Sequence, residues 1–240
     1  MRLSTSFTWP TALQPFFAKQ QSTPASIAQI RALAWPLADL DEALFQMAQW
    51  TGVLSKEEAA RLTPGPVEHV DAVALDRWLD VATGQMSMEV ETVSASYGEV
   101  SHLLHYGAPA LVPIYATRQQ VLETSTTLLP NFLVLLKGSR WRVTLLGADG
   151  AIHQYPTEMV RAAISAAWEI PLQLTIETLL DGMAMPEERR HDARVGLLHE
   201  ELRQVEIPGF RLLRLTPGNG FWRQVRQIGL TGYLWSSMIT

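Results

Sequence analysis

The spacing of apolar residues predicts short helices in the first part of the chain. Residues 37–50 carry apolar side chains close to helical spacing, and a Thr-Gly pair ends the run. Residues 55–58, Ser-Lys-Glu-Glu, have the spacing of a capping box and predict the start of another short helix. Residues 73–82 form a further amphipathic pattern, which closes at Gly84.

Alternating and continuous apolar runs predict strands in the middle of the chain. Residues 131–150 read as an apolar strand, a tight Gly-Ser turn and a second apolar strand that ends at another Gly turn, which indicates a β-hairpin. Further strands are expected at residues 90–94, 110–115 and 152–155, and helices at residues 97–104 and 157–168. Helices followed by a mostly antiparallel sheet indicate the α+β class.

After Pro171 the pattern predicts mainly helix. Helices are expected at residues 172–180 and from Glu187 to about Gln204, followed by a short apolar run that begins at Phe210. The sequence contains no visible internal repeat or low-complexity segment.

The hairpin and the elements around it resemble the peptidase domain of bacteriocin-type ABC exporters, the double-glycine-leader peptidases, which have a papain-like fold. In that family the hairpin opens with a catalytic His followed by an apolar run, and an Asp sixteen residues later orients the His. The nucleophilic Cys opens an earlier helix that ends about a dozen residues on. The residues of this chain that match these elements lie within positions 30–165.

This chain departs from the family at each reacting position. Leu40 falls at the nucleophile, Asn131 at the His and Gly147 at the Asp, and the chain has no cysteine. No Gln lies near residues 33–34, where the resemblance places the oxyanion-hole residue. The residues that acyl transfer requires at these positions are therefore missing, and we expect no peptidase activity. Haemolysin-type exporters carry a comparable inactive domain that engages the transported polypeptide, so the resemblance implies a peptide-binding role, with Asp39, Asn131 and Trp141 as candidates.

The resemblance also suggests a division of the chain and a partner set. We expect a lead-in at 1–30, a peptidase-like domain at 31–170, a helical extension at 171–218 and an interfacial elbow helix at 219–240. The implied partners are the transported peptide or protein, the transmembrane and ATP-binding domains of the same exporter, and a second copy of the chain. The implied location is the cytoplasmic side of a bacterial inner membrane.

Composition excludes several other classes. With a net charge of −5 and no basic cluster, the chain lacks the concentrated cations that nucleic-acid binding requires. The absence of cysteine excludes disulfides and thiolate metal sites. His102 and His105, three residues apart, lack a third ligand at an obvious spacing, and we interpret them as surface histidines. The sequence implies neither a metal nor a cofactor.

The last twenty residues have a pattern typical of membrane interfaces. Aromatic and basic residues precede an uncharged apolar run, as in a chain that approaches a bilayer. The candidate interface residues are Phe221, Trp222, Arg223, Arg226 and Trp235.

Two other functions remain open at this point. One is a free-standing, non-catalytic scaffold or peptide-binding protein of a biosynthetic or secretion system. The other is an enzyme of a different class that uses His and carboxylates, although no spacing in the sequence suggests such a centre.

Overall fold

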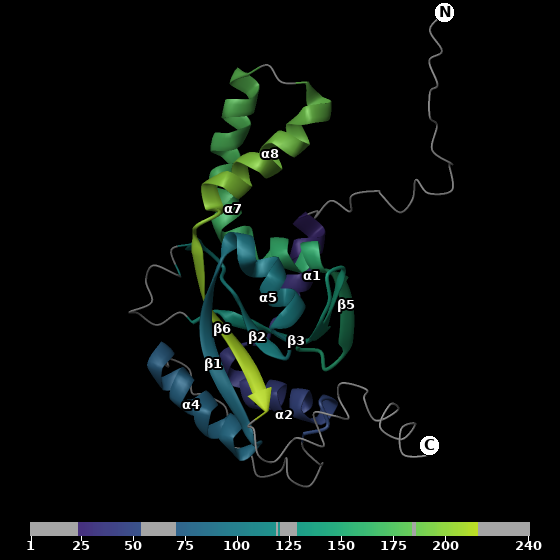
Figure 1. Cartoon of the computed structure of the whole chain (residues 1–240), viewed down its shortest axis with the longest axis vertical. Helices are drawn as coiled ribbons and strands as arrows, with labels where there is room; N and C mark the ends of the chain where they lie inside the picture. The colour runs from purple at the N-terminus through teal and green to yellow at the C-terminus, as the bar shows by residue number, and fades with distance from the viewer. Residues whose placement is uncertain (1–23, 54–70, 119, 121–128, 184–185, 216–240) are drawn as a thin grey trace, which may run out of the picture.

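A six-stranded antiparallel sheet lies between two groups of helices in the computed structural model, which describes residues 24–53, 71–118, 120, 129–183 and 186–215 (Figure 1). The strand order is β1-β6-β2-β3-β4-β5. The strands are β1 (Met88–Ser96), β2 (Ala110–Ile114), β3 (Asn131–Gly138), β4 (Arg142–Leu146), β5 (Ile152–Pro156) and β6 (Glu206–Leu215). The helices are α1 (Pro24–Ala32), α2 (Leu40–Trp50), α4 (Ala72–Gln85), α5 (Val100–Tyr106), α7 (Thr157–Gly182) and α8 (Glu187–Leu202). Short 3₁₀ helices, η2 (Leu37–Asp39) and η3 (Tyr97–Glu99), precede α2 and α5.

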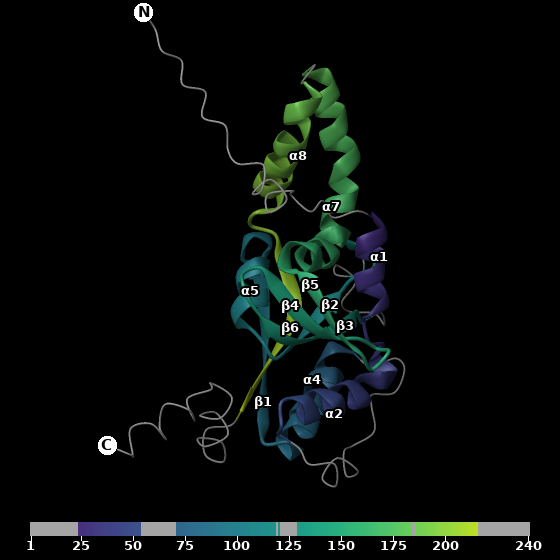
Figure 2. The same ribbon diagram turned by 90° about the vertical axis from the view of Figure 1, so that its right-hand side faces the viewer.

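The sheet is buried on both faces at β3, which explains the continuous apolar run of this strand. Alternate side chains of a strand point to opposite faces. Phe132, Val134 and Leu136 therefore join the core beneath α2 and α4, whereas Leu133 and Leu135 join the core beneath α1, α5 and α7. Figure 2 shows the two helical groups on opposite sides of the sheet.

The α+β class, the antiparallel sheet and the predicted hairpin are confirmed. β3 pairs with β2 on one side and with β4 on the other, so the hairpin's first strand is interior.

Two expectations for the last part of the chain are wrong. The helix predicted to end near Trp168 continues through Pro171 as one element, α7, because Ile176 and Leu180 beyond the proline pack into the same core as Trp168. The expected helical extension also ends in a strand: β6 lies between β1 and β2, inside the sheet. α7 and α8 together project from the body of the molecule (Figure 1).

Several predictions lie outside the described residues. These are the helix at residues 55–58, most of the lead-in at 1–30, and the interfacial segment at 219–240 with Phe221, Trp222, Arg223, Arg226 and Trp235. Within the part of the chain that the structure describes, no helix has the length and apolar character needed to span a membrane.

Candidate functional site

The segment before α2 lies across one end of the β3–β4 hairpin and organises the candidate site. Trp35 and Phe132 exchange two backbone hydrogen bonds, of 2.7 Å and 2.9 Å. The Trp35 indole Nε1 donates to the Leu146 carbonyl at 3.0 Å, and the Ala148 amide donates to the Leu33 carbonyl at 3.1 Å. Residues next to Asn131 and Gly147 are thereby tied to the chain that leads into α2.

Leu40, at the position of the nucleophile, belongs to the core. It is the first residue of α2, is completely buried, and lies in the same apolar cluster as Phe132 and Val134. Asp39 is exposed, and its side chain makes no capping hydrogen bond to the helix. Asn131 is exposed at the start of β3, where it is paired with Ile114.

Gly147, at the position of the orienting Asp, is closely surrounded by three side chains. A Cβ there would lie 2.5 Å from Asp149 Oδ1, 3.0 Å from Leu33 Cδ2 and 3.2 Å from His153 Cδ2. Real Cβ atoms essentially never show contacts as short as the first. The end of the hairpin is therefore packed closed at the point where the resembled family carries its carboxylate.

Asp149 and His153 form a His–carboxylate pair beside Gly147. His153 Nε2 lies 2.9 Å from Asp149 Oδ2, and Asp149 Oδ1 accepts a 3.0 Å hydrogen bond from the Ala151 amide. This amide and then His153 hold the pKa of Asp149 below its usual value. The pair fastens the β4–β5 turn, and no described serine or threonine is hydrogen-bonded to the imidazole to act as a nucleophile.

The tip of the hairpin presents Trp141 on a rigid turn. The Ser139 hydroxyl donates to the Arg142 carbonyl at 2.8 Å and accepts from the Arg142 amide at 3.0 Å. Thr157 donates from its hydroxyl to the Ser139 carbonyl and from its amide to the Trp141 carbonyl. The Trp141 side chain is nevertheless 72% exposed, with the Arg140 guanidinium 5.0 Å from its ring centroid.

The other end of β3 touches α5 more closely than any side chain would permit. A Cβ on Gly138 would lie 1.9 Å from the Leu104 carbonyl oxygen and 2.8 Å from that of His105. α5 carries His102 and His105, whose rings lie 4.6 Å and 3.9 Å from the ring of Tyr106. His105 therefore stacks on the Tyr106 ring and His102 packs tilted against it. The described residues contain no group of three or more His, Asp or Glu suited to a metal.

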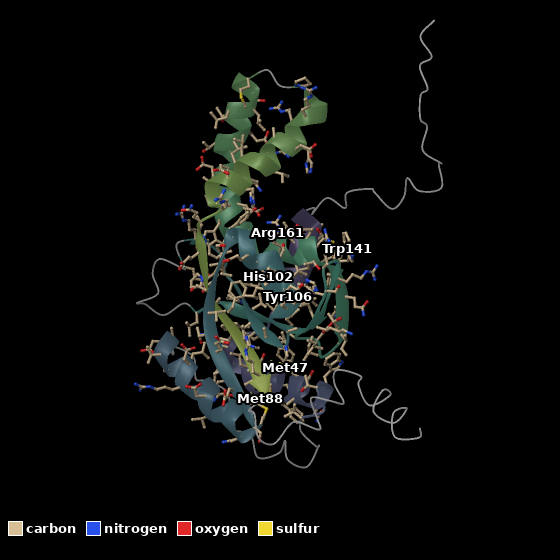
Figure 3. The ribbon with its side chains drawn as sticks, in the orientation of Figure 1. Met47, Met88, His102, Tyr106, Trp141 and Arg161 are labelled. Carbon is tan, nitrogen blue, oxygen red and sulfur yellow. The ribbon has the colours of Figure 1, made fainter. Side chains whose placement is uncertain are left out.

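A polar network that the sequence did not reveal joins η3 to α7. The Tyr97 hydroxyl donates to Glu169 Oε1 at 2.8 Å and accepts from Arg161 Nη1 at 3.0 Å. Arg161 also donates to Glu158 Oε2 at 2.9 Å. Figure 3 shows Arg161 close to the region of α5 that carries His102. Burial raises the pKa of Tyr97 to about 12. Burial alone would lower the pKa of Arg161, but Tyr97, Glu158 and Glu169 outweigh it and raise that pKa.

A second buried cation lies on the opposite face of the sheet. Arg211, 3% exposed, donates from Nε to Asp76 Oδ1 at 2.9 Å and from Nη1 to the Gly209 carbonyl at 3.0 Å. Its guanidinium lies 5.0 Å from the Phe132 ring centroid. Phe210 and Leu212 flank Arg211 in β6, and an arginine between apolar residues was the sequence signal available for a central strand with a paired charge. Both networks are satisfied internally, which favours a structural role.

The structure brings Leu40, Asn131 and Gly147 to one end of the hairpin and leaves Trp141 at the other end. The first end is closely packed, and the second presents an exposed aromatic side chain on a hydrogen-bonded turn. Comparison of the chain with models of protein families found no match. Comparison with curated proteins likewise found no relative.

Proposed function

We propose that this chain is a catalytically inactive, papain-like peptidase-like domain that binds the polypeptide transported by a peptide- or protein-exporting ABC transporter. The proposal rests on which residues occupy three positions around the end of the hairpin and on how they are packed. Leu40 is core, Asn131 is an exposed amide, and Gly147 is packed against Leu33 and the Asp149–His153 pair. The elements that would carry nucleophile, base and orienter are in contact, while their chemistry is absent.

Two further features support a binding role over an enzymatic one. The Asp149–His153 pair is engaged with a turn amide and has no hydrogen-bonded nucleophile among the described residues. Hydrogen bonds of Ser139 and Thr157 fix the backbone of the hairpin tip, and the Trp141 ring takes no part in them. The ring is therefore held in an exposed position. A rigid exposed aromatic loses little conformational entropy when a partner covers it.

The test is an in-frame deletion of residues 24–215 from the gene in its native cell. Mass spectrometry then compares polypeptides in the medium with those retained inside. We expect one or a few polypeptides to accumulate inside and to be depleted outside, with their leaders processed as before. An unchanged exported set would refute the transporter proposal. Normal export with arrested maturation of a peptide would favour the scaffold alternative.

A complementary measurement addresses catalysis. The purified protein is incubated with a synthetic peptide that contains a double-glycine leader, and the products are separated by mass. We expect no cleavage, because Leu40 replaces the thiol and no imidazole lies at Asn131. Turnover of the peptide would contradict the assignment of an inactive domain.

A further inference from the structure

The outer edge of β5 is open within the described part of the chain. β5 is the last strand of the sheet and pairs with β4 on one side only. The Gly147 amide donates to the Ala151 carbonyl at 2.9 Å and the Thr157 amide donates to the Trp141 carbonyl at 3.1 Å, at the two ends of this ladder. Antiparallel residues alternate between bonding inward and outward. The amides and carbonyls of Ile152 and Gln154 therefore point away from β4.

A basic surface lies beside this edge. Lys137 and Arg142 are exposed, and register places both on the face of the sheet that carries Thr144, because Lys137 pairs with Thr144 and Arg142 is two residues away from it. Arg140 is exposed and lies over the Trp141 ring.

The charge of this region is opposite to that of the whole chain. Asp149 is the single acidic residue between positions 124 and 157, whereas the whole chain carries a net charge of −5. No ion pair among the described residues engages Lys137, Arg140 or Arg142. These three cations are therefore available to acidic groups of a partner.

Register places Arg142 within reach of a strand added to β5. Arg142 is paired with Pro156 at the end of β5 that adjoins the Trp141 turn. An added strand would lie two strand spacings from β4, which is about 10 Å, a gap that an arginine and a glutamate side chain bridge between them. Figure 3 shows Trp141 at this side of the molecule. The opposite end of β5 carries Asp149, which repels acidic side chains.

We propose that the outer edge of β5 binds an extended, acidic segment of the transported polypeptide as a seventh strand, with Trp141 covering an apolar side chain of that segment. This rests on the proposed function and names the surface and the chemistry of recognition. The open backbone groups of Ile152 and Gln154 require a polypeptide strand, and Arg142, in a region with two further cations, favours carboxylates. Acidic residues of the segment lie toward Pro156, and pairing ends there because Pro156 has no amide hydrogen.

A nucleic acid fits this surface less well, because it offers no backbone amides and carbonyls to complete the sheet edge. The overall charge of −5 also opposes binding of a polyanion. Competition with single-stranded DNA is therefore part of the test.

The probe is a short fluorescent peptide of alternating glutamate and valine, with a lysine-for-glutamate peptide as its comparison. Anisotropy titration of the whole chain should show binding of the acidic peptide and none of the basic one. Arg142→Glu should weaken binding by about tenfold or more, since it reverses a charge beside the bound strand. Arg189→Glu makes the same charge change on exposed α8 and should leave the affinity within about twofold.

A backbone variant separates strand addition from simple charge attraction. Gln154→Pro removes an outward-pointing amide hydrogen without breaking a bond to β4, whereas Gln154→Ala retains it. We expect the proline variant to lose binding and the alanine variant to retain it. Circular dichroism should show that both variants are folded. If Gln154→Pro does not fold, the Arg142→Glu and Arg189→Glu pair still decides the proposal.

Three outcomes would overturn the inference. These are equal affinity for the acidic and basic peptides, equal binding by Arg142→Glu and Arg189→Glu, or displacement of the acidic peptide by single-stranded DNA of the same charge. The result is separable from the proposed function. Acidic-peptide binding with unchanged export after deletion of residues 24–215 would refute the transporter role alone. Deletion-dependent export with normal binding by Arg142→Glu would refute the β5 surface alone.

Discussion

Replacing Gly138 with alanine should destabilise the fold strongly, because β3 touches the backbone of α5 at this position. The added Cβ would lie 1.9 Å from the Leu104 carbonyl oxygen, so ordinary contact requires α5 to move by roughly 1.5 Å. Val100 and Leu104 of α5 are completely buried and would lose packing in that movement. Overpacking typically costs 1–3 kcal/mol, and with this loss we expect about 3 kcal/mol or more.

The measurement is urea unfolding followed by tryptophan fluorescence, with Gly84→Ala as the matched variant. Nothing lies within 4 Å of a Cβ on Gly84, which is near the end of α4. Alanine there should stabilise the protein by about 0.5–1 kcal/mol. For Gly138→Ala a loss of about 3 kcal/mol lowers the urea midpoint by roughly 1 M or more. A midpoint within about 0.2 M of the parent would refute the close approach of β3 to α5.

Three other predictions concern the core, the position of Leu40 and the buried tyrosines. Val134→Asp should cost several kcal/mol of unfolding free energy by burying an unpaired charge. Thr144→Asp, at a half-exposed strand position, should cost far less. Equal denaturation midpoints of the two variants would contradict this prediction. Leu40→Cys should not generate cleavage of a double-glycine leader peptide, because Asn131 supplies no imidazole to deprotonate the thiol. Product formation in a mass-spectrometric assay would refute this. Burial raises the pKa of Tyr97 and of Tyr115 to about 12, so the stability that they contribute is complete below pH 10 and falls between pH 10 and 12. Tyrosinate absorbance should show both side chains ionising late. Ionisation of all five tyrosines near pH 10 would contradict this prediction.

Local patterning was sufficient to predict the hairpin and most of the helices. The β3 run from Phe132 to Leu136 is apolar at every position, and the Gly-Ser turn follows within two residues. These signals depend on neighbours in sequence, which is why the boundaries of β3, β4 and β5 lie within one or two residues of expectation.

The position of β6 could not be read in the same way. Its residues pair with β1 and β2, which lie about a hundred positions earlier in the chain. Pairing at such separations depends on contacts between distant parts of the chain, and no local period encodes them. The continuation of α7 through Pro171 has a similar origin, because burial of Trp168, Ile176 and Leu180 in one core outweighs the hydrogen bond that proline removes.

The sequence by itself determined which reacting groups are absent from three positions of this chain. It contains no cysteine, and Leu40, Asn131 and Gly147 carry no thiol, imidazole or carboxylate, whatever fold surrounds them. Only the tertiary structure decided that the space at Gly147 is filled, that Arg211 is a buried and paired charge, and that β5 is left at the edge of the sheet. The physical reason is that residue identity sets which reactions are possible, whereas space, desolvation and unpaired backbone groups arise from segments that meet only when the chain folds.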